Sequence, residues 1–153
     1  MGPGGLEQLA YQLSAQLLSH QESALDEVRA RTGTLLAASA LVASFLGAQA
    51  IEKTGLSALT VLALAAFVAS TLPSVYVLLP KRNVVFALRG SVLFETEFAE
   101  GSETAATYRH LTYWAEDAYD ANRAAVRRIA KAYRVAAFAL VLEILFWTTE
   151  LLR

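Results

Sequence analysis

Three stretches of this chain are almost wholly apolar: TLLAASALVASFLGAQAI at residues 34–51, LSALTVLALAAFVASTLPSVYVLL at 56–79 and VAAFALVLEILFWTTELL at 135–152. A helix needs about 20 apolar residues to cross the hydrocarbon core of a bilayer. Only EKTG separates the first two stretches, whereas the long polar and aromatic segment 80–134 precedes the third. The pattern predicts an all-α integral membrane protein with three transmembrane helices, organised as a single membrane domain over residues 1–153.

The composition supports this prediction. The chain has 153 residues, and 56% of them are apolar, which exceeds the usual fraction in a soluble domain. The alternative is a soluble helical bundle, but so small a chain has little interior in which to bury helices that are apolar on every side. The chain has no Cys, which excludes disulfides, thiolate metal sites and thiol catalysis.

The distribution of Lys and Arg predicts the orientation, because these residues are in excess in the cytoplasmic flanks of transmembrane helices. Arg29 and Arg31 precede the first stretch, Lys53 lies in the short turn and Arg153 ends the chain. The remaining cations all lie in segment 80–134: Lys81, Arg82, Arg89, Arg109, Arg123, Arg127, Arg128, Lys131 and Arg134. We therefore expect the N-terminus in the cytoplasm and the C-terminus outside.

The segment before the first span predicts an amphipathic cytoplasmic helix over residues 6–33. Its apolar residues recur at helical spacing: Leu6, Leu9, Leu13, Leu17, Ala24 and Val28. No helix breaker separates this segment from the first span, so the two can form one helix. We expect the apolar stripe to pack in the cytoplasmic layer or against neighbouring subunits; the alternative is an anchor that lies on the membrane surface.

Segment 80–134 predicts a connector followed by a helix. The connector is rich in Val, Phe and Leu between residues 84 and 98, which fits a short β-hairpin or an irregular strand-free link. From residue 104 a helical stripe runs without a break toward the third span: Tyr108, Leu111, Ala115, Ala118, Asn122, Val126, Ile129 and Tyr133. This stripe would pack inward, or against a second copy as a short coiled coil.

Small residues and one proline mark the first two spans. Small residues at a spacing of four let helix backbones approach closely in lipid, and two such sets predict helix packing: Ser39, Ala43 and Gly47, and Ala66, Ser70 and Ser74. They would join the two spans as a hairpin or serve a subunit contact. Pro73 removes a backbone hydrogen bond, so we expect a kink there that either acts as a hinge in gating or is merely tolerated.

Glu143 lies in the middle of the third span, between Leu142 and Ile144. A carboxylate inside the membrane costs several kcal/mol unless it is paired, neutral or facing water. We therefore expect Glu143 to face a pore or a helix interface and to take part in gating. The alternatives are a partly interfacial third segment, or a neutral Glu143 set against a Ser or Gln49 of a neighbour.

The residue content argues against an enzyme. The two histidines, His20 and His110, lie in separate segments, and no phosphate-binding glycine loop or pair of nucleophile and base is present. We expect no catalytic residue, no metal site and no bound cofactor.

Cations and aromatic residues occur together in the cytoplasmic segment. Phosphate is bound by Arg and Lys, and a base stacks on aromatic faces. The mixture suits a nucleotide pocket with five candidate residues: Lys81, Arg82, Arg89, Arg109 and Trp114. Composition alone favours the alternative, in which Lys81 and Arg82 only anchor the second span while the aromatic residues pack the helix.

The order of short motifs resembles a known family. A helix ends in RARTG at 29–33, the first span contains FLG at 45–47, and the second closes on LPK at 79–81. The aromatic connector and the helix from Tyr108 into a final span follow. This order is similar to the Pycsar family of transmembrane effectors in bacterial anti-phage systems and, more loosely, to two-span effector domains of nucleotide-signalling systems.

The resemblance implies antiviral defence. An effector of this kind rests in the bacterial inner membrane, where its partners are lipids and further copies of itself in a homo-oligomer, and not nucleic acid. The resemblance implies that during phage infection a cyclic nucleotide, with a cyclic pyrimidine mononucleotide from a separately encoded cyclase as the candidate, binds its cytoplasmic side. It then disrupts or permeabilises the membrane, as an ion channel would, and growth stops. The rival hypothesis is a non-conducting membrane adaptor that docks a soluble partner through its cytoplasmic helices.

Overall fold

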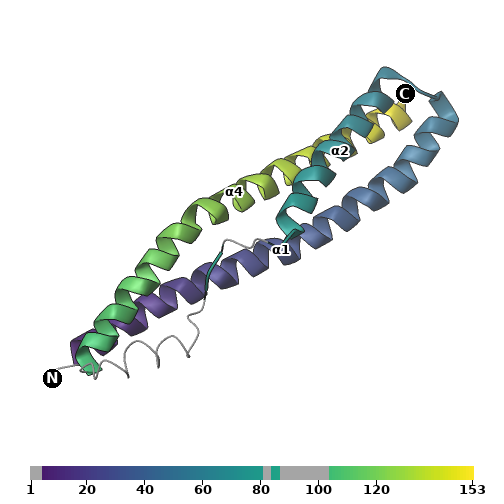
Figure 1. Ribbon diagram of the computed structural model, residues 1–153. Helices are drawn as coiled ribbons and strands as arrows, with labels where there is room; N and C mark the ends of the chain where they lie inside the picture. Colours follow the sequence, from purple (N-terminus) through teal and green to yellow (C-terminus); the bar gives the residue numbers. More distant parts are fainter. Residues whose placement is uncertain (1–4, 81–83, 87–103) are drawn as a thin grey trace. The chain divides into compact units, whose positions relative to one another are not determined.

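The computed structural model describes residues 5–80, 84–86 and 104–153. These residues form three helices, α1 (Gly5–Thr54), α2 (Ala58–Leu78) and α4 (Thr104–Leu152), and contain no strand (Figure 1). All three helices are long and apolar enough to cross a membrane. The prediction of an all-α chain with three such helices is confirmed. Residues 84–86 are not part of a strand, and the rest of the expected hairpin lies outside the described residues.

The two long helices are continuous where the sequence has no breaker. α1 joins the predicted amphipathic segment to the first apolar stretch, and α4 joins the cytoplasmic stripe to the third. Pro73 lies inside α2 and does not end it. Continuity is expected in α1 and α4, because neither contains an internal proline or a run of turn residues that would interrupt the backbone hydrogen bonds.

The turn between α1 and α2 is set by one glycine and one serine. Gly55 has a φ of 70°, a left-handed conformation that glycine adopts without steric cost, and its amide donates to the Ile51 carbonyl at 2.9 Å. Ser57 then caps α2 by accepting a hydrogen bond from the Thr60 amide at 3.2 Å. The three residues 55–57 therefore reverse the chain.

The chain divides into two compact units, and each long helix contributes to both. The first unit comprises Met1–Leu25 and Lys81–Arg127, and the second comprises Asp26–Pro80 and Arg128–Arg153. The two units are described in turn.

In the second unit, α1 and α4 run parallel and α2 runs antiparallel to them. Three contacts between α1 and α4 follow the same order along both helices: Ser39 with Glu143, Gly47 with Trp147, and Lys53 with the Leu151 carbonyl. Ala50 of α1, Ala63 of α2 and Trp147 of α4 form one buried cluster, so all three helices meet.

Small and polar residues fill the interior of the second unit. The fully buried side chains include Thr60, Ser70 and Ser74 of α2 and Glu143 of α4. Bulky apolar side chains face outward instead: Phe45, Leu72 and Phe138 are 65–66% exposed. A soluble protein buries such side chains, whereas a membrane protein exposes them to lipid and packs its helices through small residues. The unit is compatible with a membrane protein.

In the first unit, the N-terminal parts of α1 and α4 also run parallel. Glu7, Ser14 and Gln21 of α1 contact, in that order, Arg109, Glu116 and Tyr119 of α4. The side chains of α1 buried in this unit are Ser14, Leu18, Gln21 and Leu25. α1 therefore packs on α4 through a face that contains two polar residues.

The predicted leucine stripe of α1 lies on a different face from these buried residues. Leu6, Leu9, Leu13 and Leu17 are all exposed, and Leu6 is 70% exposed. The described part of this chain does not bury the stripe, so its packing in a cytoplasmic layer or against neighbouring subunits stays a prediction. The buried face of α1 lies next to the leucine stripe and contains Ser14 and Gln21, which form hydrogen bonds to α4. The side of α1 that packs on α4 is therefore the side with these polar contacts and not the side with the leucines. The exposed stripe remains available to another copy or a membrane surface.

Candidate functional site

Glu143 of α4 is the buried carboxylate at the centre of the second unit. It has no exposed surface, and the Ser39 hydroxyl of α1 donates to its Oε2 at 2.5 Å. Its Oε1 has no hydrogen-bond partner among the described residues. The structure therefore sets Glu143 in a helix interface against a serine of its own chain, whereas Gln49 is exposed.

Trp147 lies one helical turn after Glu143 on the same buried face. Its indole packs on Gly47 of α1 so closely that an added Cβ on that glycine would lie 3.1 Å from the ring. The Trp147 Nε1 lacks an acceptor among the described residues, as Glu143 Oε1 lacks a donor. The Trp147 Nε1 donor and the Glu143 Oε1 acceptor therefore lie one turn apart on the same face of α4, and neither forms a hydrogen bond with the described residues.

A second buried carboxylate, Glu150, lies one further turn along the same face. Both of its oxygens lack a hydrogen-bond partner among the described residues. The Lys53 ammonium donates to the adjacent Leu151 carbonyl at 2.8 Å. The end of α4 that carries Glu150 therefore contacts Lys53 of α1, next to the turn between α1 and α2.

The six predicted packing residues all lie on the inner side of the second unit. Five are buried and Ala43 is half-buried, the full set being Ser39, Ala43, Gly47, Ala66, Ser70 and Ser74. The two α1 residues of this set whose partners are identified, Ser39 and Gly47, contact α4. The small-residue stripe of α1 therefore serves α4 and is not reserved for a hairpin with α2.

Pro73 lines an open cleft between α2 and α4. The cleft has a volume of about 440 Å³, and its α4 wall carries Arg128 and Lys131 beside Val135. The cleft is an opening beside the proline, but the structure contains no second state of α2, so the hinge at Pro73 stays a prediction.

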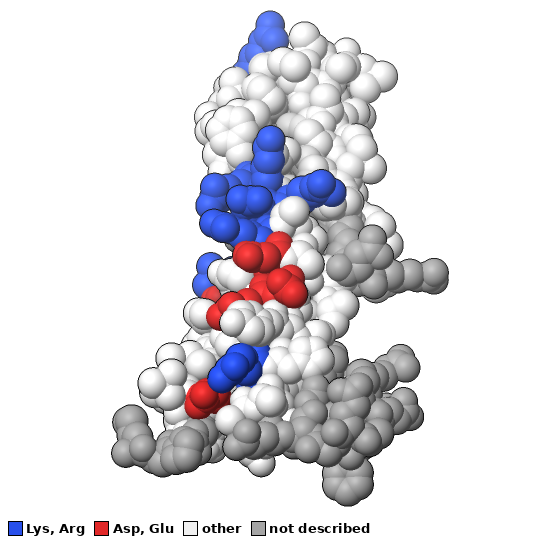
Figure 2. All heavy atoms as spheres, turned by 60° about the vertical axis from the view of Figure 1, so that its left-hand side comes forward, with Lys and Arg blue, Asp and Glu red and all other residues white. Residues whose placement is uncertain are grey.

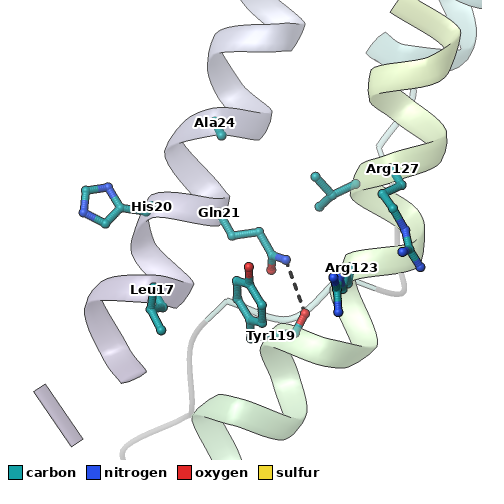
Figure 3. A pocket seen from close by; sticks show the side chains of 8 residues that line it. Leu17, His20, Gln21, Ala24, Tyr119, Arg123 and Arg127 are labelled. Atoms are coloured by element: carbon teal, nitrogen blue, oxygen red, sulfur yellow. Dashed lines mark hydrogen bonds between the residues drawn. The ribbon is translucent and has the colours of Figure 1, made fainter. Parts of the chain in front are cut away.

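A groove lies between α1 and α4 in the first unit (Figure 3). It has a volume of about 380 Å³ and is lined by Leu17, His20, Gln21, Ala24, Tyr119, Arg123, Val126 and Arg127. Figure 3 shows Gln21 extending from α1 toward α4, where its Nε2 donates to the Tyr119 carbonyl at 3.2 Å. The groove thus combines apolar walls, an aromatic ring, an amide and two guanidinium groups.

Asn122 of α4 holds the connector that follows α2. Its Oδ1 accepts from the Val85 amide at 3.0 Å and its Nδ2 donates to the Val85 carbonyl at 2.8 Å. Asn122 is fully buried, so the residue that the sequence indicated only as part of a packing stripe is the clamp of this unit. Its signal was a lone amide in an otherwise apolar and aromatic stripe.

Asn122 and the two buried carboxylates share one spacing. The buried positions of α4 recur every seven residues: Ala115, Asn122, Ile129, Ala136, Glu143 and Glu150. A seven-residue repeat is the pattern of helices that pack with a left-handed crossing, and a polar residue at such a position fixes register at a cost in stability. The spacing from Ile129 to Glu143 is visible in the sequence and would have predicted that Glu143 faces inward.

The predicted ligand residues are only partly described. Lys81, Arg82 and Arg89 lie outside the described residues. Arg109 reaches Glu7 of α1 at 3.5 Å and Trp114 is half-buried on α4, but neither lines the groove. The prediction of a ligand at these five residues is therefore untested.

Charge is unevenly distributed on α4. Along its sequence Glu116, Asp117 and Asp120 come first, and Arg123, Arg127, Arg128 and Lys131 follow. On the face shown in Figure 2, acidic and basic side chains gather in adjacent groups below a largely uncharged surface. Among the described residues no group of three or more His, Asp or Glu side chains is placed to hold a metal ion.

A scan against models of protein families and searches of curated proteins and of solved structures found no match to this chain. The similarity to the Pycsar effectors therefore rests on the order of sequence motifs alone.

Proposed function

We propose that this protein is an anti-phage effector of the bacterial inner membrane. A cyclic nucleotide binds its cytoplasmic side, and the protein then permeabilises the membrane and arrests growth. The observation that carries the proposal is Glu143, a carboxylate buried in an apolar helix of spanning length. Such residues are rare and mark ion or substrate paths in membrane proteins.

In the proposed resting state the interior of the second unit is closed. Ser39 bonds to Glu143 and the Trp147 ring covers Gly47, so the polar residues of α1 and α4 face each other and not water. Because α4 is uninterrupted from Thr104 to Leu152, a ligand that rotates its cytoplasmic part also rotates Glu143. Separation of Glu143 from Ser39 would then open a polar path.

The proposed orientation and assembly follow the same reasoning. The N-terminus is cytoplasmic and the C-terminus external, because that arrangement leaves most cations inside. The exposed stripe of Leu6, Leu9, Leu13 and Leu17 supports a homo-oligomer, since a path lined by one carboxylate per chain needs several chains around it. The same stripe would also suit the rival adaptor, which would dock a soluble partner there.

Leakage from liposomes separates the two functions. The purified protein is reconstituted with an entrapped dye and titrated with cyclic CMP, cyclic UMP and cyclic AMP. An effector releases dye with at least one of them, whereas an adaptor releases none. Leakage that is absent with every nucleotide, or equal with and without them, would reject gating.

The variant Glu143→Leu tests the carboxylate itself. We expect nucleotide-dependent leakage to fall about tenfold, because a change of about 1.4 kcal/mol in the opening equilibrium suffices for that factor. Ile144→Leu is the matched control, since Ile144 is the next residue of the same helix but is exposed. Equal leakage from Glu143→Leu and wild type would remove Glu143 from the path.

A further inference from the structure

The groove of the first unit contains an acceptor without a donor. Gln21 is 91% buried, its exposed fraction being 9%. Its Nε2 is used by the Tyr119 carbonyl, which fixes the orientation of the amide, and its Oε1 has no partner among the described residues. A buried acceptor left without a hydrogen bond is costly, and because this oxygen has almost no accessible surface, a donor from the groove reaches it only after the Gln21 side chain shifts.

The rim of the groove is cationic. Arg123 and Arg127 lie one turn apart on α4, and neither forms an ion pair with the described part of the chain. His20 lies on the α1 side and points away from α4 in Figure 3. Guanidinium groups bind phosphate through charge-assisted hydrogen bonds, so an anion is the natural complement of this rim.

The walls between these groups are apolar and aromatic. Leu17, Ala24 and Val126 contribute aliphatic surface, and the half-buried Tyr119 contributes a ring. The volume of about 380 Å³ falls within the range of small-molecule sites. A ligand that fits all three features carries a phosphate, a planar or apolar body and an N–H or O–H donor.

We propose that this groove is a nucleotide site, in which Arg123 and Arg127 bind the phosphate, Tyr119 contacts the base and Gln21 Oε1 accepts a hydrogen bond from a base N–H. That the nucleotide is the activating ligand rests on the proposed function; the site itself does not. It differs from the two predicted ligand residues that the structure describes, Arg109 and Trp114, neither of which lines the groove. Pyrimidine and adenine bases all offer an N–H donor on their pairing edge.

The same chemistry could come from a lipid headgroup, which also carries a phosphate beside hydroxyl or amine donors. The binding experiment therefore uses two preparations of the full chain. In a neutral detergent without anionic lipid, only the added nucleotide supplies phosphate. In nanodiscs, phosphatidylcholine alone is compared with phosphatidylcholine that contains phosphatidylglycerol.

Calorimetric titration with cyclic CMP, cyclic UMP and cyclic AMP measures binding to wild type and variants. Arg123→Ala should weaken binding about tenfold and Arg123→Ala with Arg127→Ala about a hundredfold, each lost charged contact being worth about a factor of ten. Gln21→Leu should weaken it about tenfold. The controls are Arg109→Ala and Gln12→Leu, exposed residues of the same two helices outside the groove. Because Arg123 is exposed, its variant remains informative if Gln21→Leu impairs folding.

Weakening by the groove variants and not by the controls supports the site. If nucleotide affinity is unchanged in all groove variants, or no nucleotide binds in either preparation, the site is rejected. Binding of fluorescent phosphatidylglycerol with the same variant pattern, without nucleotide binding, would reject the nucleotide and assign the groove to a headgroup.

The leakage assay on the same variants distinguishes this inference from the proposed function. Nucleotide-dependent leakage that persists with normal affinity in Arg123→Ala would reject the groove but keep the effector. Groove-dependent binding without any leakage would keep the site and reject the effector.

Discussion

The two units of this chain use the same pair of parallel helices in different ways. In the first unit the buried face of α1 combines two leucines, Leu18 and Leu25, with two polar residues, Ser14 and Gln21. In the second unit Glu143 and Ser39 are buried and Phe45 is exposed. The two units therefore have different interiors, although α4 runs through both.

The difference shows that burial alone does not identify a core. In a lipid bilayer the hydrophobic effect gives little drive for helix association, and close packing and interhelical hydrogen bonds hold helices together. The Trp147–Gly47 contact and the Ser39–Glu143 bond are of these two kinds. In the first unit the Asn122–Val85 clamp is a polar bond within a partly apolar interface.

We expect the largest difference in stability between the two units when the tryptophan of each is replaced. Trp147→Ala should lower the free energy of unfolding by about 3–5 kcal/mol, because it opens a cavity against Gly47 in a fully packed interior. Trp114→Ala, the matched change in the first unit, should cost clearly less, since Trp114 is only half-buried. Unfolding by a denaturing detergent measures both. Equal losses would mean that the second unit is not packed more tightly around its tryptophan.

An intermediate effect is expected at the connector clamp. Asn122→Ala removes both bonds to Val85 and should lower the free energy of unfolding by about 1–3 kcal/mol, since two part-buried hydrogen bonds are lost. The same variant should expose the connector to protease, which limited proteolysis with mass spectrometry would locate. Asn122→Asp, which keeps the acceptor and loses the donor, is the control. A cleavage pattern identical to that of wild type would show that the clamp does not hold the connector.

The smallest effects compare one polar contact in each unit. Ser39→Ala should cost about 0.6 kcal/mol and at most about 1.7 kcal/mol, the mean and the maximum measured for hydrogen bonds between membrane helices. Arg109→Ala should cost less than about 1 kcal/mol, because its pair with Glu7 is exposed and screened. Raising the salt concentration should reduce the second loss and leave the first unchanged. If the loss of stability caused by Ser39→Ala depends on the salt concentration, the Ser39–Glu143 contact is exposed to water.

Most of the fold follows from local sequence. The three apolar stretches, the absence of breakers before residue 34 and residue 135, and the Gly55 turn together define the helices to within two or three residues at the turn. These features act over one or two helical turns, so neighbouring residues suffice to predict them. The connector 84–98 is the exception, because apolar residues between turn signals are compatible with more than one local structure.

The site was less accessible to prediction. Glu143 was identified from its cost in an apolar helix, but its partner Ser39 is more than a hundred residues away. Nothing in the sequence marked Gln21 and Arg123 as groove residues, because each is an ordinary polar residue of its own helix. Their role depends on the packing of α1 against α4. The leucine stripe gave a strong signal, but these leucines are exposed in the single chain and their partner stays a prediction.

The sequence by itself determined that the chain is helical, where its helices begin and end, and which segments are apolar enough for a membrane. The tertiary structure decided which face of each helix is inside: Ser14 and Gln21 rather than Leu13 and Leu17, and Glu143 toward Ser39. The physical reason is the sequence separation over which the deciding interactions act. Helix formation depends on residues within a few positions, whereas the buried face depends on which side chains of a distant helix complete its hydrogen bonds and fill its gaps.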